Sequence, residues 1–313
     1  MELAHAFALA ALIAAPALAQ DAAEPVTPAS VVAAAPASDW RAIDPADLLV
    51  MTLAPDRDAN PRQVVIQLMP PPFSRGWVGN IRTLAKAHWW DGTSVYRVVD
   101  NWVAQWGDGE DDEAKAKPLP EELREVPESE YVADPVDSAL REQVFDFAAA
   151  EYPELFDNYS FGTSHWRGWP YATDHMKVWP THCYGSVGVA RSIESTGTGS
   201  ELYAVIGHAP RQLDRNIAVV GRVIEGIEHL STLPRGKGDA GVYDDAALRV
   251  PIVSVRLGDD LAEAGRPQFE YLDGDSFTQY VHVRANRNDP FYKVGAGGVD
   301  VCNVQVPIRR IAR

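Results

Sequence analysis

Short apolar segments that end at turn residues recur along most of this chain, and they constrain its fold more than any other feature. Each is rich in Val, Ile, Leu or Tyr and is bounded by Gly, Pro, Asp or Asn, which is typical of a short strand. Many short strands separated by turns favour a β-barrel or a β-sandwich over a doubly wound parallel sheet. The segments span residues 63–70, 91–99, 102–107, 185–192, 201–207, 216–226 and 249–258.

One longer helix is predicted within this β-rich pattern. Trp77, Ile81 and Leu84 recur at helical spacing within residues 72–90, so one face of the helix is expected to pack on a core. A second, shorter helix is expected in “GIEHLSTL” (226–233), directly after a strand.

Residues 108–182 interrupt the strand pattern and are interpreted as a large insertion. A charged, Pro-containing stretch comes first, and residues 137–156 then show the pattern of one amphipathic helix. The aromatic segment “SHWRGWPYATDHMKVWPTHCYG” (164–185) is punctuated by proline and is expected to be irregular. The insertion is therefore predicted to be partly helical.

The two ends of the chain differ from its middle. “AFALAALIAAPALA” (6–19) is an apolar run ending in a small-x-small pattern, so we expect a signal peptide cleaved after residue 19 and a periplasmic or secreted protein. Residues 20–45 are rich in Ala, Pro and Ser and are predicted to be a flexible linker. The main domain is expected to span residues 46–258, with 259–313 as a C-terminal extension that packs on it.

Charge and cysteine content narrow the possible partners and compartment. A formal net charge of -16 and a pI near 4.9 argue against nucleic acid or an anionic membrane as a partner, and we expect a monomer. Cys183 and Cys302 lie far apart in the sequence. In an exported protein they could form a disulfide that ties the tail to the main domain, or remain two buried free thiols. The sequence leaves both open.

One arginine stands in unusual surroundings. Arg97 lies among Val95, Val98 and Val99 in “TSVYRVVDNWVAQWGD” (93–108). Arginine is always charged in proteins, and its burial without a partner is costly. Either Arg97 points outward from a strand, or the chain keeps a cation beside an apolar pocket for a chemical reason.

The order of the motifs resembles that of the cyclophilins, the family of peptidyl-prolyl cis-trans isomerases, here of an exported, bacterial kind. Asn80-Ile81-Arg82 stands for the family's Asn-aromatic-Arg motif, and residues 96–99 for its aromatic-His-Arg-Val-Ile segment. “WVAQWGD” (102–108) matches the form Phe-x-x-Gln-Gly-Gly-Asp. Residues 197–226 resemble the Gly-Ser-Gln-Phe-Phe-Ile strand and the Leu-Asp-Gly segment that follow. The resemblance covers about 63–107 and 185–258.

This resemblance implies a fold and a set of site residues. The family fold is an eight-stranded antiparallel β-barrel capped by two helices, with its active site on an outer face. By position, Arg97 takes the place of the catalytic arginine and Gln105 that of the glutamine beside it. The expected substrate-binding residues are Trp102, Val103, Tyr203 and Leu213.

The expected chemistry explains why an arginine is needed. Resonance gives the peptide C–N bond a rotation barrier of about 18–20 kcal/mol, and uncatalysed X-Pro isomerisation takes tens to hundreds of seconds. At the twisted transition state the prolyl nitrogen regains its lone pair. A fixed guanidinium that donates to this lone pair stabilises the twisted state more than either planar state. Gln105 would anchor the substrate backbone or orient Arg97. No cofactor and no metal is expected.

Several positions depart from the family pattern. Arg211 or Gln212 stands where the family commonly has a pocket tryptophan, Ile217 replaces a pocket histidine, and Glu201 replaces the glutamine of Gly-Ser-Gln. A second hypothesis is therefore kept, namely a catalytically weak cyclophilin-like module that binds or scaffolds proline-containing polypeptides. Four residues crowd the insertion without the spacing of a compact metal motif: His165, Asp174, His175 and His182.

Overall fold

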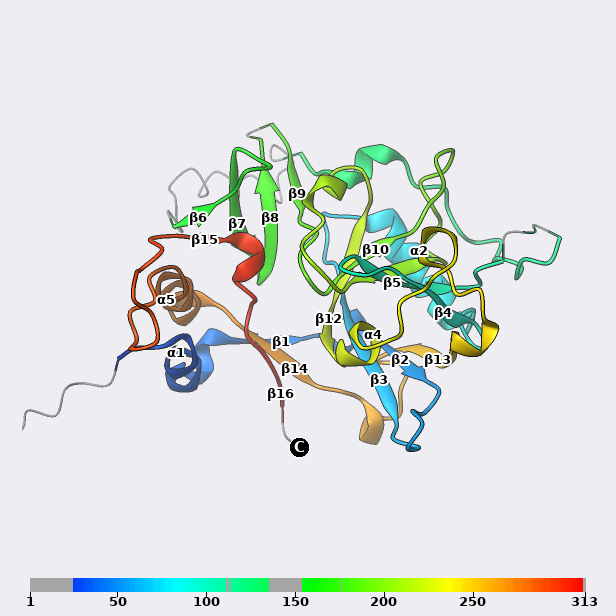
Figure 1. The fold of residues 1–313 in the computed structure, drawn as a ribbon, viewed down its shortest axis with the longest axis horizontal. Helices are drawn as coiled ribbons and strands as arrows, with labels where there is room; N and C mark the ends of the chain where they lie inside the picture. Colours follow the sequence, from blue (N-terminus) through cyan, green and yellow to red (C-terminus); the bar gives the residue numbers. More distant parts are fainter. Residues whose placement is uncertain (1–24, 111, 113, 135–153, 175, 312–313) are drawn as a thin grey trace, which may run out of the picture.

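The computed structural model describes residues 25–110, 112, 114–134, 154–174 and 176–311. Figure 1 shows a β-barrel on one side and, beside it, a smaller unit that contains helices α1 and α5. Within the described part of the chain, no helix has the length and apolar character needed to cross a membrane.

The barrel is closed and antiparallel, which confirms the predicted fold class. Its strands follow the order β10-β11-β5-β4-β13-β2-β3-β12 around the barrel. Seven of these strands coincide with the apolar segments identified in the sequence, whereas the first strand of the barrel, β2, lies before the first of those segments. The strands are β2 (Leu48–Leu53), β3 (Arg62–Leu68), β4 (Ser94–Val98), β5 (Val103–Gly107), β10 (Ser186–Val189), β11 (Leu202–Val205), β12 (Val219–Glu225) and β13 (Val250–Leu257).

The barrel interior is filled by alternate side chains of its strands and is closed at one end by a helix. Met51, Ile66, Ala104 and Trp106 belong to one buried apolar cluster, as expected where every second side chain of a strand faces the core. Helix α2 (Arg75–Lys86) adds Trp77, Ile81 and Leu84 to this cluster, which confirms the predicted core-facing helix. The second helix, α4 (Glu228–Ser231), is a single turn.

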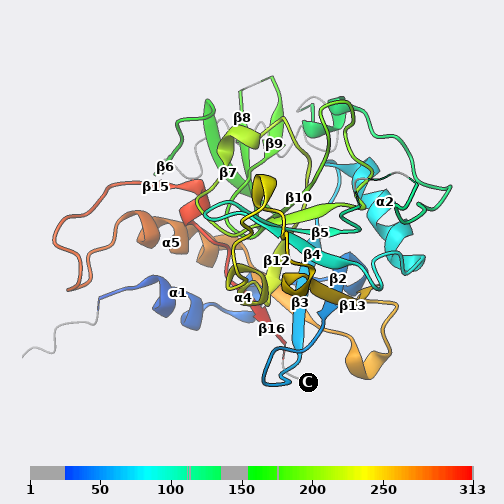
Figure 2. The same ribbon diagram turned by 45° about the vertical axis from the view of Figure 1, so that its right-hand side comes forward.

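Residues from both ends of the chain form the smaller unit, which corrects the predicted linker. Residues 28–43 are ordered, because α1 (Pro28–Ala34) and β1 (Trp40–Ile43) occupy most of this segment. Strand β1 pairs with β14 (Phe269–Leu272), which pairs in turn with β16 (Ile308–Arg310). Helix α1 lies beside α5 (Gly274–Ala285), as both views show (Figures 1 and 2).

The N-terminal residues 28–43 are ordered because they pack into a second core, which the Ala, Pro and Ser content of this segment does not indicate. Val31 and Trp40 are buried with residues of the C-terminal extension. Thr27 and Ser30 form a capping box, and Pro28 occupies the first turn, so α1 has strong local start signals. The members of this second core are Val31, Trp40, Leu272, Phe277, Tyr280, Val281 and Val304.

The insertion is more regular than its sequence indicated. The segment expected to be irregular folds as an antiparallel meander of β7 (Gly162–Trp166), β8 (Trp169–Thr173) and β9 (Val178–Pro180). Arg167 and Gly168 join the first two strands, both with positive φ, which is the geometry of a tight two-residue hairpin. Aromatic side chains therefore belong here to a small sheet.

The other described parts of the insertion contain less helix than the sequence predicted. A 3-10 turn covers Glu128–Tyr131. Most of the amphipathic helix expected at 137–156 lies outside the described residues. Its last two positions instead form β6 (Leu155–Phe156), which pairs in parallel with β15 (Val299–Asp300) of the C-terminal extension.

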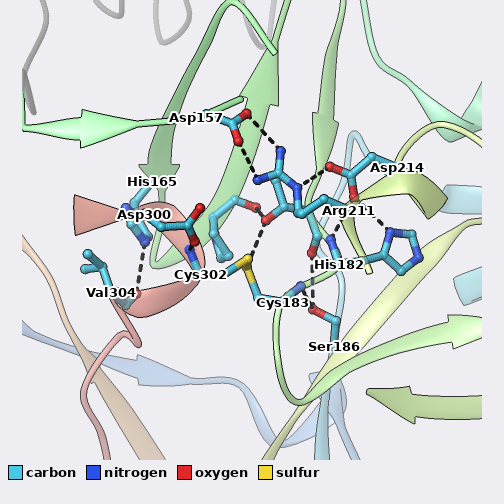
Figure 3. The surroundings of a disulfide bond; sticks show 12 residues. Asp157, His165, His182, Cys183, Ser186, Arg211, Asp214, Asp300, Cys302 and Val304 are labelled. Carbon is cyan, nitrogen blue, oxygen red and sulfur yellow. Dashed lines mark hydrogen bonds and ion pairs between the residues drawn. A yellow bond between two sulfur atoms is a disulfide. The ribbon is translucent and has the colours of Figure 1, made fainter. Parts of the chain in front are cut away.

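A disulfide joins the barrel side to the tail. Cys183 and Cys302 are bonded across a sequence separation of 119 residues, as Figure 3 shows. The alternative of two free thiols is therefore wrong. The C-terminal extension also packs on the barrel through Phe269, which is buried with Leu48, Val50 and Val65.

Candidate functional site

All six predicted site residues meet at one pocket on the outer face of the barrel. The pocket has a volume of about 520 Å³. On β5 and β11 the side chains of Ala104 and Ala204 face the barrel core, so their neighbours Gln105 and Tyr203 face outward. The six residues around the pocket are Arg97, Trp102, Val103, Gln105, Tyr203 and Leu213.

Arg97 projects from β4 and is held only by neutral acceptors. Its Nη1 donates to Gln105 Oε1 at 2.8 Å, and its Nε donates to the Ala240 carbonyl at 2.7 Å. The strand has a bulge between Val95 and Arg97, and such bulges commonly re-aim a side chain. Among the described residues, none provides a carboxylate partner for this guanidinium. Burial lowers the pKa of Arg97 from its ordinary value, and its charge is left for a bound group.

A series of hydrogen-bonded side chains behind Arg97 fixes the orientation of its guanidinium. Gln105 Nε2 donates to the Tyr96 hydroxyl, and that hydroxyl donates to Glu201 Oε2 at 2.9 Å. The Asp108 backbone N–H donates to the other oxygen, Glu201 Oε1, at 2.7 Å. Because the side-chain amide nitrogen of Gln105 donates to Tyr96, the amide oxygen of the same side chain faces Arg97. Of the two roles considered for Gln105, the structure shows the orienting contact.

Sequence reasoning noticed Glu201 only as a departure from the family motif. Burial raises the pKa of Glu201, although the hydrogen bonds from Tyr96, Asp108 and Gly109 act in the opposite direction. Burial likewise raises the pKa of the Tyr96 phenol, and the neighbouring Glu201 charge adds to this. The phenol therefore stays protonated and donates. The cross-strand contact that assigns Glu201 its role lies between residues 105 positions apart, so spacing alone could not reveal it.

The apolar wall of the pocket lies beside Arg97. Val103 and Tyr203 are buried in a cluster with Val205, and Trp102 and Ile217 pack against it. Leu213 belongs to the 3-10 turn Arg211–Leu213, which brings it to the pocket. A mostly apolar wall with a few polar groups beside it is typical of a binding pocket.

Tyr203 needs a glycine on the neighbouring strand. A Cβ atom on Gly188 would lie 2.3 Å from the Cζ atom and from the hydroxyl oxygen of Tyr203. Gly188 and Tyr203 are directly opposite in the β10–β11 register. The small residue in “GSVGVARS” therefore serves the placement of this ring, a pairing that the sequence alone did not reveal.

The Tyr203 hydroxyl contacts a buried polar network, of which Figure 3 shows His182, Asp214, Arg211 and Asp157. The Tyr203 hydroxyl is 3.0 Å from Nε2 of His182, and His182 Nδ1 is 3.0 Å from Asp214 Oδ1. Arg211 bonds Asp214 and also holds Asp157 through two contacts of 2.9 and 3.0 Å. Burial acts against the charged form of both Asp214 and Arg211. Their mutual attraction and hydrogen bonds nevertheless lower the pKa of Asp214 and raise that of Arg211.

The four residues weighed as metal ligands have other partners or lie outside the description. His182 belongs to the network above, His165 Nε2 lies 3.3 Å from the Val304 carbonyl, and Asp174 pairs with Arg215. His175 lies outside the described residues. Within the ranges that the structure describes, no group of three or more His, Cys, Asp or Glu side chains could hold a metal ion.

Comparison with known proteins identifies the family. The family described as cyclophilin type peptidyl-prolyl cis-trans isomerase/CLD matches residues 75–257, which is more than half of the chain. The chain thus belongs to the cyclophilin-type peptidyl-prolyl cis-trans isomerases. Membership implies isomerase activity and substrates that are proline-containing peptides. A search of the curated proteins found no match.

One solved structure supports the same fold, and a second is less similar. The crystal structure of the cyclophilin AquaCyp293 from Hirschia baltica is 21% identical, with a TM-score of 0.60, and the match covers 91% of this chain and 98% of that one. A cyclophilin type isomerase from Cryptosporidium parvum, solved in the presence of the dipeptide Ala-Pro, is 12% identical with a TM-score of 0.36. That match covers 66% of this chain and 98% of the other.

Proposed function

We propose that this protein is an exported peptidyl-prolyl cis-trans isomerase that accelerates rotation about X-Pro bonds during the folding of other exported proteins. The observation that carries the proposal is the state of Arg97. Its guanidinium lies at an apolar pocket and donates to the neutral oxygens of Gln105 and Ala240, and no carboxylate of the described residues neutralises it. A partly buried charge of this kind is suited to stabilise charge that develops on a bound substrate.

In the proposed mechanism, the apolar wall holds the proline ring while the acyl side of the X-Pro bond turns. Trp102, Val103 and Tyr203 supply this wall. When conjugation is lost, the prolyl nitrogen becomes pyramidal, and Arg97 donates to its lone pair. A hydrogen bond that involves a charged group contributes about 1.5–3 kcal/mol. Each 1.36 kcal/mol of selective stabilisation is a tenfold gain in rate, so one such bond accounts for roughly tenfold to a hundredfold.

Gln105, Tyr96 and Glu201 act as positioning residues in this mechanism. They restrict the side-chain torsions of Arg97 before the substrate arrives, and a preorganised donor avoids reorganisation during the reaction. The substrate is an X-Pro segment of a polypeptide, and the reaction uses no nucleophile, because no covalent bond forms or breaks.

Export is supported by two independent features. The apolar run at 6–19 has the form of a signal peptide, and a disulfide between Cys183 and Cys302 is typical of an oxidising compartment. We therefore place the protein in the periplasm or outside the cell.

The test is an isomerisation assay on short Xaa-Pro peptides, read by NMR exchange between their cis and trans forms. We expect the mature protein to accelerate exchange and Arg97→Ala to lose roughly a hundredfold in kcat/KM. Arg41→Ala is the matched control, since Arg41 lies on the exposed edge of β1 in the smaller unit. Circular dichroism checks that each variant is folded.

Two outcomes would redirect the proposal. If folded wild type binds the peptides without accelerating exchange, the protein is a proline-binding module and the enzyme proposal fails. If Arg97→Ala keeps full activity, the enzyme assignment stands but the lone-pair role of Arg97 is overturned. Secretion is tested separately, by locating the processed protein in cell fractions.

A further inference from the structure

A second and larger cavity lies where the barrel meets the smaller unit. Its volume is about 810 Å³, within the range of roughly 300–1,000 Å³ typical of small-molecule sites, which often form between domains. Its walls come from β12, the meander, the tail before β16 and helix α1. These elements surround the junction of the two bodies in Figures 1 and 2. Most of the lining is apolar, and its aliphatic side chains include Val32, Val223, Ile224, Val304, Val306 and Ile308.

Arg222 is the one cation among the described residues that line this cavity. Its Nε and Nη2 donate to Gln67 Oε1 at 2.9 and 2.7 Å, and its Nη1 donates to the Gly168 carbonyl. The guanidinium stacks 4.3 Å from the centroid of the Trp169 ring. An arginine has five N–H donors, so these three contacts leave two for another acceptor.

No described carboxylate neutralises Arg222, which sets it apart from Arg211. Arg211 is also enclosed, with 3% of its surface exposed, but it is paired with both Asp157 and Asp214. The chain has 44 acidic residues against 28 Lys and Arg, so a shortage of carboxylates is not the reason. Burial lowers the pKa of Arg222 to about 9, which is the expected response of a desolvated cation without a counter-charge.

The acidic residues of the lining do not supply that counter-charge. Glu225 is paired with Arg310, through contacts of 3.0 Å and shorter. Glu228 keeps 65% of its side chain exposed to solvent, so water screens its charge. Arg222 is thus in the same electrostatic state as Arg97: partly buried, bonded to neutral oxygens, and facing a cavity.

We infer that this cavity binds a medium-chain aliphatic carboxylate, with the carboxylate at Arg222 and the hydrocarbon chain along the aliphatic wall. The charge calls for a single anion, and a planar guanidinium with free N–H groups matches a carboxylate. The length and apolar character of the lining call for a hydrocarbon body rather than a polar metabolite. The site is separate from the pocket at Arg97 and does not depend on the isomerase assignment.

The test is calorimetric titration of the full-length mature protein with octanoate and, separately, with 1-octanol. A purely apolar cavity would prefer the alcohol, because the alcohol carries no charge to desolvate. We expect saturable binding of octanoate, at least tenfold tighter than that of the alcohol. Arg222→Met should weaken octanoate binding at least tenfold and remove this preference.

Arg222 also bonds the Gly168 carbonyl in the β7–β8 hairpin, so its substitution could disturb the structure. A variant on α1 therefore tests the cavity without changing Arg222. Ala33 is exposed and lines the cavity, whereas its neighbour Ala34 is exposed and does not. Ala33→Trp should fill the cavity and weaken octanoate binding at least tenfold, while Ala34→Trp binds as wild type does. Isomerase activity should be unchanged in both variants.

Three results would overturn the inference. One is a lack of octanoate binding by the folded wild type. Another is binding that Ala33→Trp leaves intact, since the ligand would then lie elsewhere. The third is tighter binding of acetyl-Leu-Leu with a free carboxylate than of octanoate, which would assign the cavity to a peptide C-terminus instead.

Discussion

Two regions of this molecule hold an arginine in opposite ways. At the outer face of the barrel, Arg97 donates to the neutral oxygens of Gln105 and Ala240. At the junction of the insertion and the barrel, Arg211 is held between two carboxylates, those of Asp157 and Asp214. The first arrangement leaves a positive charge available to a ligand, and the second cancels it.

The presence or absence of a carboxylate partner distinguishes an arginine that can act on a ligand from one that only stabilises the fold. A neutralised buried cation can only hold parts of the structure together, and Arg211 does so between the insertion and the barrel. An un-neutralised cation is costly to the fold, so its presence beside a pocket points to a ligand. The predictions below ask whether the two regions are as independent as this contrast implies.

The largest expected effect belongs to the disulfide at the junction. Cys302→Ser opens a loop closed over 119 residues, and the chain-entropy model gives a loss of about 5 kcal/mol in the free energy of unfolding for a loop of that size. Urea unfolding of the oxidised wild type and of the variant measures this. At temperatures where the variant remains folded, kcat/KM should stay within about twofold of wild type. A loss of activity in the folded variant would break the contrast, because the junction would then control the pocket.

Removal of Arg211 should come next in size. Arg211→Met leaves Asp157 and Asp214 without their cation, and breaking a buried ion pair in this way costs roughly 3–5 kcal/mol of stability. Arg97→Met is the matched comparison and should cost only about 1 kcal/mol, because the loss of the guanidinium's hydrogen bonds to Gln105 and Ala240 is offset by relief of the cost of burying an unpaired charge. The free energies of unfolding of the two variants test this directly. Equal losses would show that Arg97 is as structural as Arg211.

Sequence patterns were sufficient to identify the six residues of the pocket at Arg97, although not the role of Glu201 behind them. The motif order and the family resemblance placed Arg97, Gln105 and Trp102 together, and helical spacing identified α2. These features are local, because the residues involved lie on one strand pair or one helix. Strand β11 adds Tyr203 opposite Gln105 in register, as the family resemblance implied.

The junction and the smaller unit could not be predicted in the same way. Their contacts join residues that are far apart in the sequence, such as Arg211 with Asp157 at the junction and Trp40 opposite Leu272 in the smaller unit. Residues 20–45 have the composition of a linker, and the core that orders residues 28–43 is supplied by the C-terminal extension. His182 was considered only as a metal ligand, because its true partners, Asp214 and Tyr203, lie 32 and 21 positions away.

A pH profile tests the positioning chain behind Arg97. Burial raises the pKa of Glu201, with the nearby charge of Asp108 adding to the shift. As pH falls through this raised pKa, the carboxylate is protonated and Tyr96 loses its anionic acceptor, so Gln105 and Arg97 are held less firmly. We expect kcat/KM to fall severalfold over this range in wild type. The profile should be flat and lower in Glu201→Gln.

A surface carboxylate provides the control for this profile. Glu225→Gln removes a charge that is paired with Arg310 in the smaller unit, and it should leave the pH dependence as in wild type. If Glu201→Gln keeps the wild-type profile, the titrating group lies elsewhere and Glu201 is not a positioning residue.

The smallest expected effect concerns the one hydroxyl that joins the two regions. Tyr203 presents its ring to the substrate pocket, while its hydroxyl lies 3.0 Å from His182 Nε2 in the junction network. Tyr203→Phe keeps the ring, for which Gly188 leaves room, and should therefore change kcat by less than twofold and KM by less than threefold. The free energy of unfolding should fall by about 1–3 kcal/mol, because a buried imidazole nitrogen loses its partner. Stability should thus fall while activity hardly changes, because the ring of Tyr203 contacts the pocket and its hydroxyl contacts the buried network. A tenfold loss of kcat with the fold intact would mean instead that the junction network acts on the reaction through Tyr203, and the two regions would have to be treated as one site.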